Sequence, residues 1–395
     1  MVRCRAAWVL PISGRPVRGG VVVVDRGVIA SVGPYDGGDV EDLGEVAILP
    51  GLVNAHTHLE LSWMRGRVPP NGSMPAWAQS LIALRRSLPE DPAEPIVDAI
   101  WEARRSGTAL VGDVTNTFAT YEPLLDSSLS AALFRELIGF NPPDPDAAVK
   151  AAQDQIAALT AVQWLRPSLA PHAPYSVAPS LLSAIARSNG DRPLSIHLGE
   201  SAQEVQFLRD GSGEWRALLD RLGAWNSTWT PPGCGPVGYL DRLGLVTDRL
   251  LAVHGVQCTD EELARLAEAG ATVVTCPRSN RWTGAGVPPI DRFYGSGVQV
   301  AIGTDSLASV DDLNLFAEMA EVRRLAPRVP ASRILESATL AGARALGFGA
   351  ELGSIEAGKR SELLAVRLPA ECSDVEEYLL SGIEPADVQW LEGTR

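Results

Sequence analysis

Lysine is nearly absent from this 395-residue chain: Lys150 and Lys359 are the only two, although lysine and arginine together number 34. Cysteine is also scarce, with five residues that are widely spaced and form no Cys-x-x-Cys pair. An odd number of scattered thiols argues against a disulfide framework and predicts reduced cysteines in a cytoplasmic protein.

The chain also lacks long hydrophobic runs and an excess of positive charge. No apolar stretch approaches the length of a membrane span, and the N-terminal one is too short for a signal peptide. The net charge of −14 and the isoelectric point of about 4.9 argue against nucleic acid or an anionic membrane as partner. We therefore expect a small-molecule substrate.

Apolar segments alternate with helix-like stretches along the middle of the chain. Eight segments have strand-like composition: 46–55, 108–114, 131–137, 164–170, 193–197, 249–254, 271–276 and 297–304. Helical stretches between them include 146–159, 179–188, 260–269 and 312–325. This α/β alternation predicts a (β/α)8 TIM barrel over residues 51–350. A doubly wound open sheet is the alternative, although no Gly-x-Gly-x-x-Gly turn follows an early strand.

The two ends of the chain have a different, all-β character. Residues 20–32 are typical of a β-hairpin, with its turn at Asp25-Arg26-Gly27. The stretch 353–368 has the same strand-like character. We therefore predict that residues 1–50 and 351–395 together form a small β-sandwich.

One connection in the middle is unusually long. About fifty residues separate His197 from the next strand-like segment, and they include Trp215, Trp225 and Trp229. Long loops at the mouth of a barrel often serve as lids or substrate walls. We predict a lid over residues 200–248, and a surface insertion with its own small core is the alternative.

All five histidines fall at the ends of strand-like segments. His56 and His58 are two residues apart, so on a strand they point the same way. His197 and Asp305 end two later segments, and strand ends meet at the mouth of a barrel. Three imidazoles and one carboxylate suit one divalent cation, Zn²⁺ or alternatively Fe²⁺, with a position left for water. A packed core histidine is the ordinary alternative for each imidazole alone.

Several motifs resemble the amidohydrolase superfamily, in the branch of the cytosine, guanine and S-adenosylhomocysteine deaminases and the triazine hydrolases. The resemblance covers nearly the whole chain and departs from the family pattern at Ser361-Glu362, where Ala-Asp is usual. The motifs are Pro50-Gly-Leu-Val-Asn-Ala-His-Thr-His58, His197-Leu-Gly-Glu200, His254, Cys276-Pro-Arg-Ser-Asn280, Gly303-Thr-Asp-Ser306 and Gly353-Ser-Ile-Glu-Ala-Gly-Lys359.

The resemblance implies a hydrolytic deaminase and gives each residue a role. His56, His58, His197 and Asp305 are expected to bind one metal ion. His254 is expected to orient the activated water and to stabilise developing negative charge, with a second metal ligand or a packed imidazole as the alternatives. Asp305 accepts the proton of water, and Glu200 delivers a proton to a ring nitrogen and then to the leaving amine. A lid salt bridge is the other interpretation of Glu200.

The scarcity of lysine bears on the number of metal ions. Binuclear relatives bridge two metals with a carboxylated lysine on the fourth barrel strand. The segment Trp164-Leu-Arg-Pro-Ser-Leu-Ala-Pro-His172 contains no lysine. The resemblance therefore implies a site with a single metal ion.

Two further motifs bear on the substrate. Ala170-Pro-His-Ala-Pro-Tyr175 resembles a motif of nucleoside-type deaminases, which implies that His172 contacts substrate. His56-Thr-His-Leu-Glu-Leu-Ser62 is most similar to the aminodeoxyfutalosine deaminases of an alternative menaquinone pathway, whose substrate is an adenine nucleoside with a benzoate-bearing tail. Glu60 is then expected to bind a ribose or base edge. Arg278, Arg281 or Arg65 is a candidate for the benzoate, and Trp63 or Trp77 for stacking on the base.

The sequence also leaves functions other than aminodeoxyfutalosine deamination open. Residues 73–78 lack the acidic residue with which S-adenosylhomocysteine deaminases bind ribose, which favours another nucleoside. A deaminase of S-adenosylhomocysteine, adenosine or another N-heterocycle, and a triazine or chlorohydrolase-type enzyme, are the alternatives. A non-catalytic scaffold is a further class, and the retained ligands argue against it. By analogy with relatives we expect a homodimer.

Overall fold

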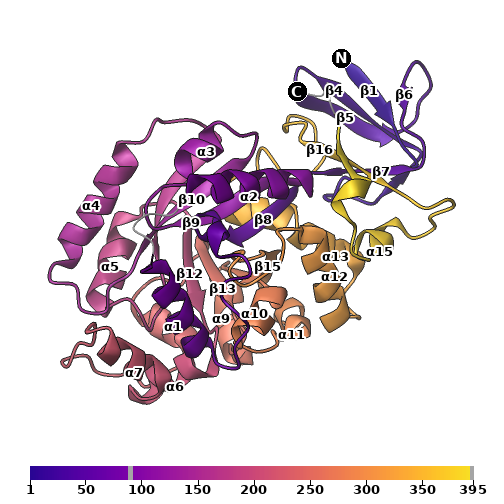
Figure 1. Ribbon diagram of the computed structural model, residues 1–395. Helices are drawn as coiled ribbons and strands as arrows, with labels where there is room; N and C mark the ends of the chain where they lie inside the picture. The colour runs from indigo at the N-terminus through magenta and orange to yellow at the C-terminus, as the bar shows by residue number, and fades with distance from the viewer. Residues whose placement is uncertain (88–91, 392–395) are drawn as a thin grey trace.

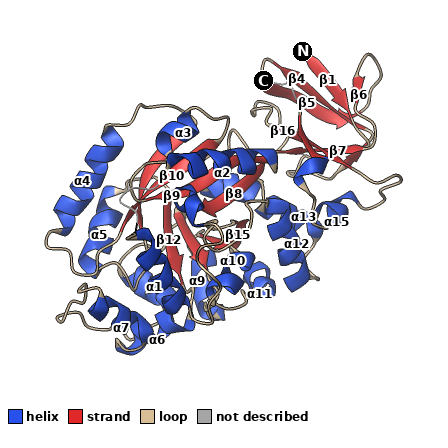
Figure 2. Cartoon of the chain, viewed as in Figure 1, coloured by secondary structure: helices blue, strands red, loops and turns tan. Residues whose placement is uncertain are grey.

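The computed structural model describes residues 1–87 and 92–391. A large α/β body is built from the middle of the chain, and a smaller β-rich part carries both termini (Figure 1). Figure 2 shows strands inside the large body with helices around them. The predicted mixed α/β architecture is therefore confirmed.

The large body contains two four-stranded parallel sheets. Their strands are β8 Leu52–Thr57, β9 Thr108–Thr115, β10 Ser130–Leu137 and β11 Leu165–Pro171, then β12 Leu194–Leu198, β13 Leu250–His254, β14 Thr272–Thr275 and β15 Gln299–Ile302. All eight lie at the predicted segments and are almost wholly buried, as expected for parallel strands covered by helices. Backbone hydrogen bonds join the sheets at both edges, from His197 N to His172 O at 2.9 Å and from Asp305 N to His56 O at 3.0 Å.

Helices connect the strands and cover their outer faces. The connecting helices are α2 Ala93–Arg105, α3 Tyr121–Leu125, α4 Pro145–Ala157, α5 Pro179–Ser188, α9 Asp260–Glu268, α10 Pro277–Thr283, α11 Ile290–Ser296, α12 Leu315–Leu325, α13 Ala331–Ser337 and α14 Leu340–Ala345. Helix α9 begins with a capping box, in which the side chains of Thr259 and Glu262 each accept a backbone N–H of the other residue. Within the described ranges, no helix is both long enough and apolar enough to cross a membrane.

Both ends of the chain contribute to two small sheets. One has the order β5-β4-β1-β6, with β1 Val2–Arg5, β4 Gly20–Asp25, β5 Val28–Pro34 and β6 Glu41–Asp42. The other has the order β17-β16-β7-β2-β3, with β2 Trp8–Val9, β3 Val17–Arg18, β7 Val46–Pro50, β16 Leu363–Arg367 and β17 Val388–Trp390. Helix α15 Val375–Leu379 lies between the last two strands. The β4–β5 hairpin turns at Arg26 and Gly27, both with positive φ, as type I′ turns require.

Gly51 divides the predicted segment 46–55 into two strands, β7 and β8, that belong to different parts of the molecule. A Cβ added at Gly51 would lie 2.5 Å from Ala109 Cβ and 2.9 Å from the Trp390 ring. Only glycine therefore allows the backbone to pass between strand β9 and the C-terminal strand β17.

The long connection after His197 is helical, which corrects the expectation of a loop. It contains α6 Ala202–Asp210, α7 Glu214–Arg221 and α8 Pro236–Arg242. Helix α7 packs against α1 Met74–Arg85, with Arg221 donating to Gln79 at 2.9 Å. Between α7 and α8, Trp225 and Trp229 pack on Phe207 of α6 and on Phe140 after β10, so the connection shares the main apolar cluster.

Candidate active site

The five histidines and Asp305 all lie at the carboxyl ends of the parallel strands. His56 is in β8 and His58 follows it; His172 follows β11; His197 and His254 are in β12 and β13; Asp305 is three residues beyond β15. The ring centroids of His56 and His58 are 4.9 Å apart, and those of His56 and His197 are 5.0 Å apart. Residues separated by up to 249 positions therefore converge on one point.

Asp305 faces two of these imidazoles. Its Oδ1 lies 3.8 Å from His56 Nε2 and 3.6 Å from His58 Nε2. His197 completes a second group with His56 and His254, in which the three nitrogens lie within 4.8 Å of one another. The residues predicted as ligands are thus brought together, and His254 joins them.

The donor set suits a divalent cation. Both ring nitrogens of His56 and the Nε2 of His197 are buried and have no hydrogen-bond partner among the described residues. Buried polar atoms are normally paired, and imidazole nitrogens with a carboxylate oxygen are typical ligands of zinc. A cation at this point would satisfy atoms that are otherwise unpaired.

Burial favours the neutral form of His56, His197 and His254, which is the form that binds metals. Burial, followed by the neighbouring imidazoles, lowers the pKa of His56 and of His197 well below the ordinary value. Burial also lowers the pKa of His254 to about 4, against the opposing effect of Asp305. The lone pairs of these rings are therefore available near neutral pH.

His254 is fixed by Asn280 on the side away from the other rings. The amide nitrogen of Asn280 lies 2.9 Å from His254 Nδ1, and with the amide as the donor the proton of the neutral ring is on Nε2. That Nε2 lies 3.0 Å from His197 Nδ1 and 3.6 Å from Glu200 Oε1. His254 thus presents an N–H donor to the centre of the site.

Two of these residues have left-handed backbones. The φ angles of His254 and Asp305 are 78° and 65°, which a residue with a Cβ adopts at a cost of about 1–3 kcal/mol. The carbonyl of Asp305 accepts from the hydroxyls of Thr57 and Thr304, both at 3.0 Å. A Cβ at Gly303 would lie within 2.9 Å of the backbone nitrogen of His56, so glycine is needed for this close approach.

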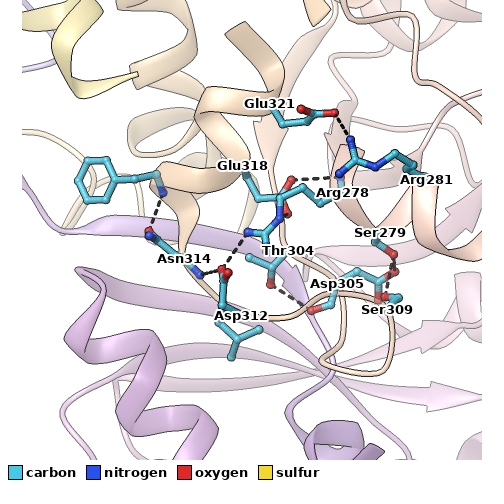
Figure 3. Close-up of polar contacts among 12 residues, drawn as sticks. Arg278, Ser279, Arg281, Thr304, Asp305, Ser309, Asp312, Asn314, Glu318 and Glu321 are labelled. Atoms are coloured by element: carbon cyan, nitrogen blue, oxygen red, sulfur yellow. Dashed lines mark hydrogen bonds and ion pairs between the residues drawn. The ribbon is translucent and has the colours of Figure 1, made fainter. Parts of the chain in front are cut away.

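The carboxylate of Asp305 is held by two donors that sequence reasoning missed. Ser279 Oγ donates to Oδ2 at 2.7 Å (Figure 3). The backbone N–H of Ser306 donates to Oδ1 at 2.7 Å. Ser279 and Asn280 lie in helix α10, which begins at Pro277. The motif Cys276-Pro-Arg-Ser-Asn280 was the available signal, but the motif alone did not assign these contacts.

Glu200 is a buried carboxyl group beside the histidines. Burial, then Asp305 and Glu204, raises the pKa of Glu200 well above its ordinary value. Glu204 holds the segment in place, since it accepts the backbone N–H groups of Gly199 and Glu200 at 3.0 and 2.9 Å. Burial therefore favours the protonated form of Glu200, which is the form that a proton donor needs.

A cavity of about 580 Å³ extends outward from this cluster. Its inner end is polar and includes His58, His172, His197, Glu200 and Asp305. Its outer part is mostly apolar and is formed by the facing helices α1 and α7 with the strand ends. The apolar lining includes Met74, Trp77, Leu81, Ile82, Ile138, Phe140, Tyr175, Trp215, Leu218, Leu219 and Leu222.

The long connection contributes a wall of this cavity. Trp215 stacks on Tyr175 with ring centroids 3.7 Å apart, and Leu218 and Leu219 continue the surface. Trp77 also lines the cavity, whereas Trp63, which packs in one apolar cluster with Trp77, Met64 and Val68, is not among the lining residues. Of the two tryptophans considered for stacking, only Trp77 faces the cavity.

His172 and Glu60 have different positions relative to the cavity. His172 lines it, with Nδ1 2.6 Å from Ser176 Oγ. Glu60 does not line it: its carboxylate accepts from the Thr115 hydroxyl, the Asn116 backbone N–H and the Arg85 guanidinium. The structure therefore corrects the expected direct contact of Glu60 with substrate, because these internal donors occupy its oxygens.

The arginines expected to bind a benzoate are paired elsewhere. Arg278 donates to Asp312 at 2.8 Å and lies 3.6 Å from Glu318 (Figure 3), and it is not among the residues that line the cavity. Arg281 pairs with Glu321, and Arg65 with Glu102. The expectation for Arg278 is corrected, because nearby acids hold its guanidinium.

Two other arginines line the cavity instead. They are Arg85, the last residue of helix α1, and Arg86, which follows it. Arg85 donates to Asn116 Oδ1 and Glu60 Oε1, both at 2.6 Å. Sequence reasoning missed both residues, since the pairing of α1 with the loop after β9 is not visible in the sequence.

Known proteins are similar to this chain over nearly its full length. A model of the amidohydrolase family matches residues 47–386. The 5-methylthioadenosine/S-adenosylhomocysteine deaminase of Moorella thermoacetica is 32% identical, covering 96% of this chain and 90% of that protein. The aminodeoxyfutalosine deaminase of Deinococcus radiodurans is 33% identical, with coverages of 85% and 83%. A crystal structure of an adenosine deaminase from Xanthomonas campestris with bound zinc has a TM-score of 0.82 and 30% identity, covering 98% and 90%.

The chain therefore belongs to the amidohydrolase family. The predictions of this family and of a hydrolytic deaminase are confirmed. The family is metal-dependent, and the cluster of imidazoles and Asp305 provides the ligands that such an enzyme needs. Its relatives act on small molecules, as expected from the composition.

Proposed function

We propose that this enzyme deaminates an adenine nucleoside carrying a large substituent at its 5′ position, and that its substrate is aminodeoxyfutalosine, an intermediate of menaquinone biosynthesis. One observation carries the proposal. The cavity has two parts. Its inner end holds a cluster of side chains suited to hydrolytic deamination, and its outer part is a long apolar arm with arginines in its wall.

We further propose that His56, His58, His197 and Asp305 hold one divalent cation, Zn²⁺. The zinc of the Xanthomonas campestris structure supports the choice of ion. A single ion is supported by the positions of the two lysines: Lys150 pairs with Asp154 on α4, and Lys359 donates to Gly349 and Ser354 near the C-terminal sheet. When bound, the cation makes a water molecule nucleophilic near neutral pH.

The protein's own residues then move the protons. Glu200, protonated because burial raises its pKa, gives its proton to the ring nitrogen beside the amino-bearing carbon. Asp305 takes a proton from the attacking water and, in place of the second transfer expected from Glu200, returns it to the amine, which leaves as ammonia. The proton of the newly formed hydroxyl restores Glu200 as the ring carbonyl forms. His254 donates its Nε2–H to the oxygen that becomes negative.

The outer cavity favours a substituent that is apolar along its length and anionic at its end. Helices α1 and α7 supply the apolar walls, and Arg86 supplies positive charge, whereas the guanidinium of Arg85 is paired with Glu60. A benzoate group has an apolar ring that fits the apolar walls and a carboxylate that a guanidinium group binds well. His172, on the wall near the ligands, is positioned for contact with the base.

Deamination of 5-methylthioadenosine or S-adenosylhomocysteine is the second candidate, supported by the Moorella thermoacetica relative. The amino-acid tail of S-adenosylhomocysteine carries an ammonium group as well as a carboxylate. The carboxylates among the described lining residues are Glu136, Glu200 and Asp305, and all three lie beside the histidines rather than along the apolar arm, where that ammonium would need a partner. The lining therefore favours the benzoate-bearing nucleoside.

We also propose that the two parallel sheets form one closed (β/α)8 barrel of residues 51–350. The edge hydrogen bonds and the shared mouth of the strands support this arrangement. A β-sandwich of residues 1–50 and 351–395 is supported by an apolar cluster shared by both terminal sheets, which includes Cys4, Val22, Ile48 and Leu363. The dimer stays a prediction.

An ammonia-release assay tests the proposed function. The substrates are aminodeoxyfutalosine, adenosine, 5-methylthioadenosine, S-adenosylhomocysteine, cytosine, guanine and a chlorinated triazine. We expect the highest kcat/KM with aminodeoxyfutalosine. Release of chloride from the triazine without deamination of any nucleoside would contradict the proposal.

A further inference from the structure

One carboxylate that faces the cavity beside the histidines belongs to none of the sequence motifs. Glu136, next to last in strand β10, lines the cavity and is only 5% exposed. One of its carboxylate oxygens lies within 4.8 Å of ring nitrogens of both His172 and His197. Glu136 therefore sits at the boundary between the reactive end of the cavity and its apolar arm.

Glu136 is held in place on one side only. Asn116 Nδ2 donates to its Oε2 at 2.7 Å, while Oδ1 of the same amide accepts from Arg85 at 2.6 Å. Glu60 in turn accepts from Arg85 and from the Asn116 backbone N–H. The side chain of Asn116 is thus fixed in orientation, and it fixes Oε2 of Glu136.

The other oxygen of Glu136 is available. Within residues 1–87 and 92–391, its Oε1 has no hydrogen-bond partner. This oxygen is not one of the fully buried unpaired atoms, so a ligand in the cavity can reach it. A carboxylate only accepts hydrogen bonds when ionised, so its matching ligand group is a donor. A polar acceptor at this boundary suits a hydroxyl-bearing part of a substrate.

We propose that Glu136 binds the ribose hydroxyls of the substrate nucleoside and selects ribonucleosides over deoxy analogues. This inference rests on the proposed function. In an adenine nucleoside, the ribose lies between the base and the 5′ substituent, as Glu136 lies between the histidine cluster and the apolar arm. The 2′- and 3′-hydroxyls are the donors of that sugar, and Glu60, expected to take this role, acts through Arg85 and Asn116.

The test compares adenosine with 2′,3′-dideoxyadenosine in the wild type, Glu136→Ala and Glu136→Gln. A hydrogen bond to a charged group makes the wild type favour adenosine, by about 10- to 100-fold in kcat/KM. We expect Glu136→Ala to lose most of that preference while its activity on the dideoxy substrate changes by less than about threefold. Glu136→Gln, which keeps an acceptor without the charge, should fall between the two.

Glu122→Ala is the matched control, since Glu122 is an exposed carboxylate on α3 away from the cavity. It should leave the preference unchanged. Equal loss of activity on both substrates, or loss of bound metal from Glu136→Ala, would overturn the role in sugar recognition. If the wild type deaminated no adenine nucleoside, the proposed function would fail first, and this inference with it. If the wild type deaminated adenosine and 2′,3′-dideoxyadenosine with the same kcat/KM, only the inference about Glu136 would fail.

Discussion

Asp305 depends on Ser279 more than the sequence suggests. Its Oδ2 is not directed at His56 or His58 and accepts the Ser279 hydroxyl instead, which orients Oδ1 toward both rings. We expect Ser279→Ala to weaken metal binding about 10- to 100-fold, the usual effect of losing a partner that orients a ligand. Competition with a chromogenic chelator measures this affinity. Ser296→Ala, on α11, is the control, and unchanged affinity in Ser279→Ala would contradict the role.

Glu200 is expected to act as an acid rather than as a ligand. Glu200→Gln keeps the shape of the side chain but cannot deliver a proton. We expect kcat to fall by about 10²- to 10⁴-fold, the usual contribution of a general acid, with metal content unchanged. Turnover near the wild-type value would exclude the assignment, whereas loss of the metal would identify Glu200 as a ligand.

The sequence predicted that the imidazoles and Asp305 converge, but it did not predict the residues that hold them in place. Strand ends and spacing were enough for His56, His58 and Asp305, because the periodicity of a strand determines where side chains point. Arg278 could not be judged in this way, since its ion pair depends on Asp312, which is 34 residues away. Glu136 and Asn116 carry no local signal, and only tertiary packing makes them neighbours.

At the scale of elements, α1 and α7 together define the outer cavity. Leu218 of α7 is buried and faces this space. We expect Leu218→Ser to lower kcat/KM for aminodeoxyfutalosine by about 10-fold, because a polar wall disfavours an apolar substituent. Adenosine, which lacks the substituent, should be affected by less than about threefold. Ammonia release from both substrates measures the difference, and equal losses would mean that α7 only supports the fold.

The strands were predictable because hydrophobic segments with turn signals mark them. The division of segment 46–55 into two strands was not predictable, since nothing in Val46–Val53 shows that Gly51 passes between two sheets. Helices α6, α7 and α8 were missed because they are only seven to nine residues long and lie among Gly, Pro and Trp residues. Their stability comes from packing on Phe140 and Phe207 rather than from local propensity.

At the scale of the whole molecule, Glu318 makes stability depend on pH. Burial raises the pKa of Glu318 from 4.5 to about 8, against the opposing effect of Arg278. The folded chain therefore binds this proton more tightly than the unfolded chain, and the contribution to stability is lost as pH rises across that range. We expect Glu318→Gln to gain Tm relative to the wild type as pH increases from 5 to 9. Calorimetry at several pH values measures the difference, and a constant difference would contradict the shift.

Metal binding should stabilise the entire chain, because its ligands come from strands β8 and β12 and from the segment after β15. An ion that binds only the folded state adds about 4 kcal/mol at a free concentration one thousand times its Kd. We expect a chelator to lower Tm and one equivalent of Zn²⁺ per chain to restore it. His58→Ala, which lacks one ligand, should show a smaller shift. If restoration required two equivalents, the single-ion site would be wrong, and if Tm did not respond to the chelator, the converging imidazoles would not hold a metal.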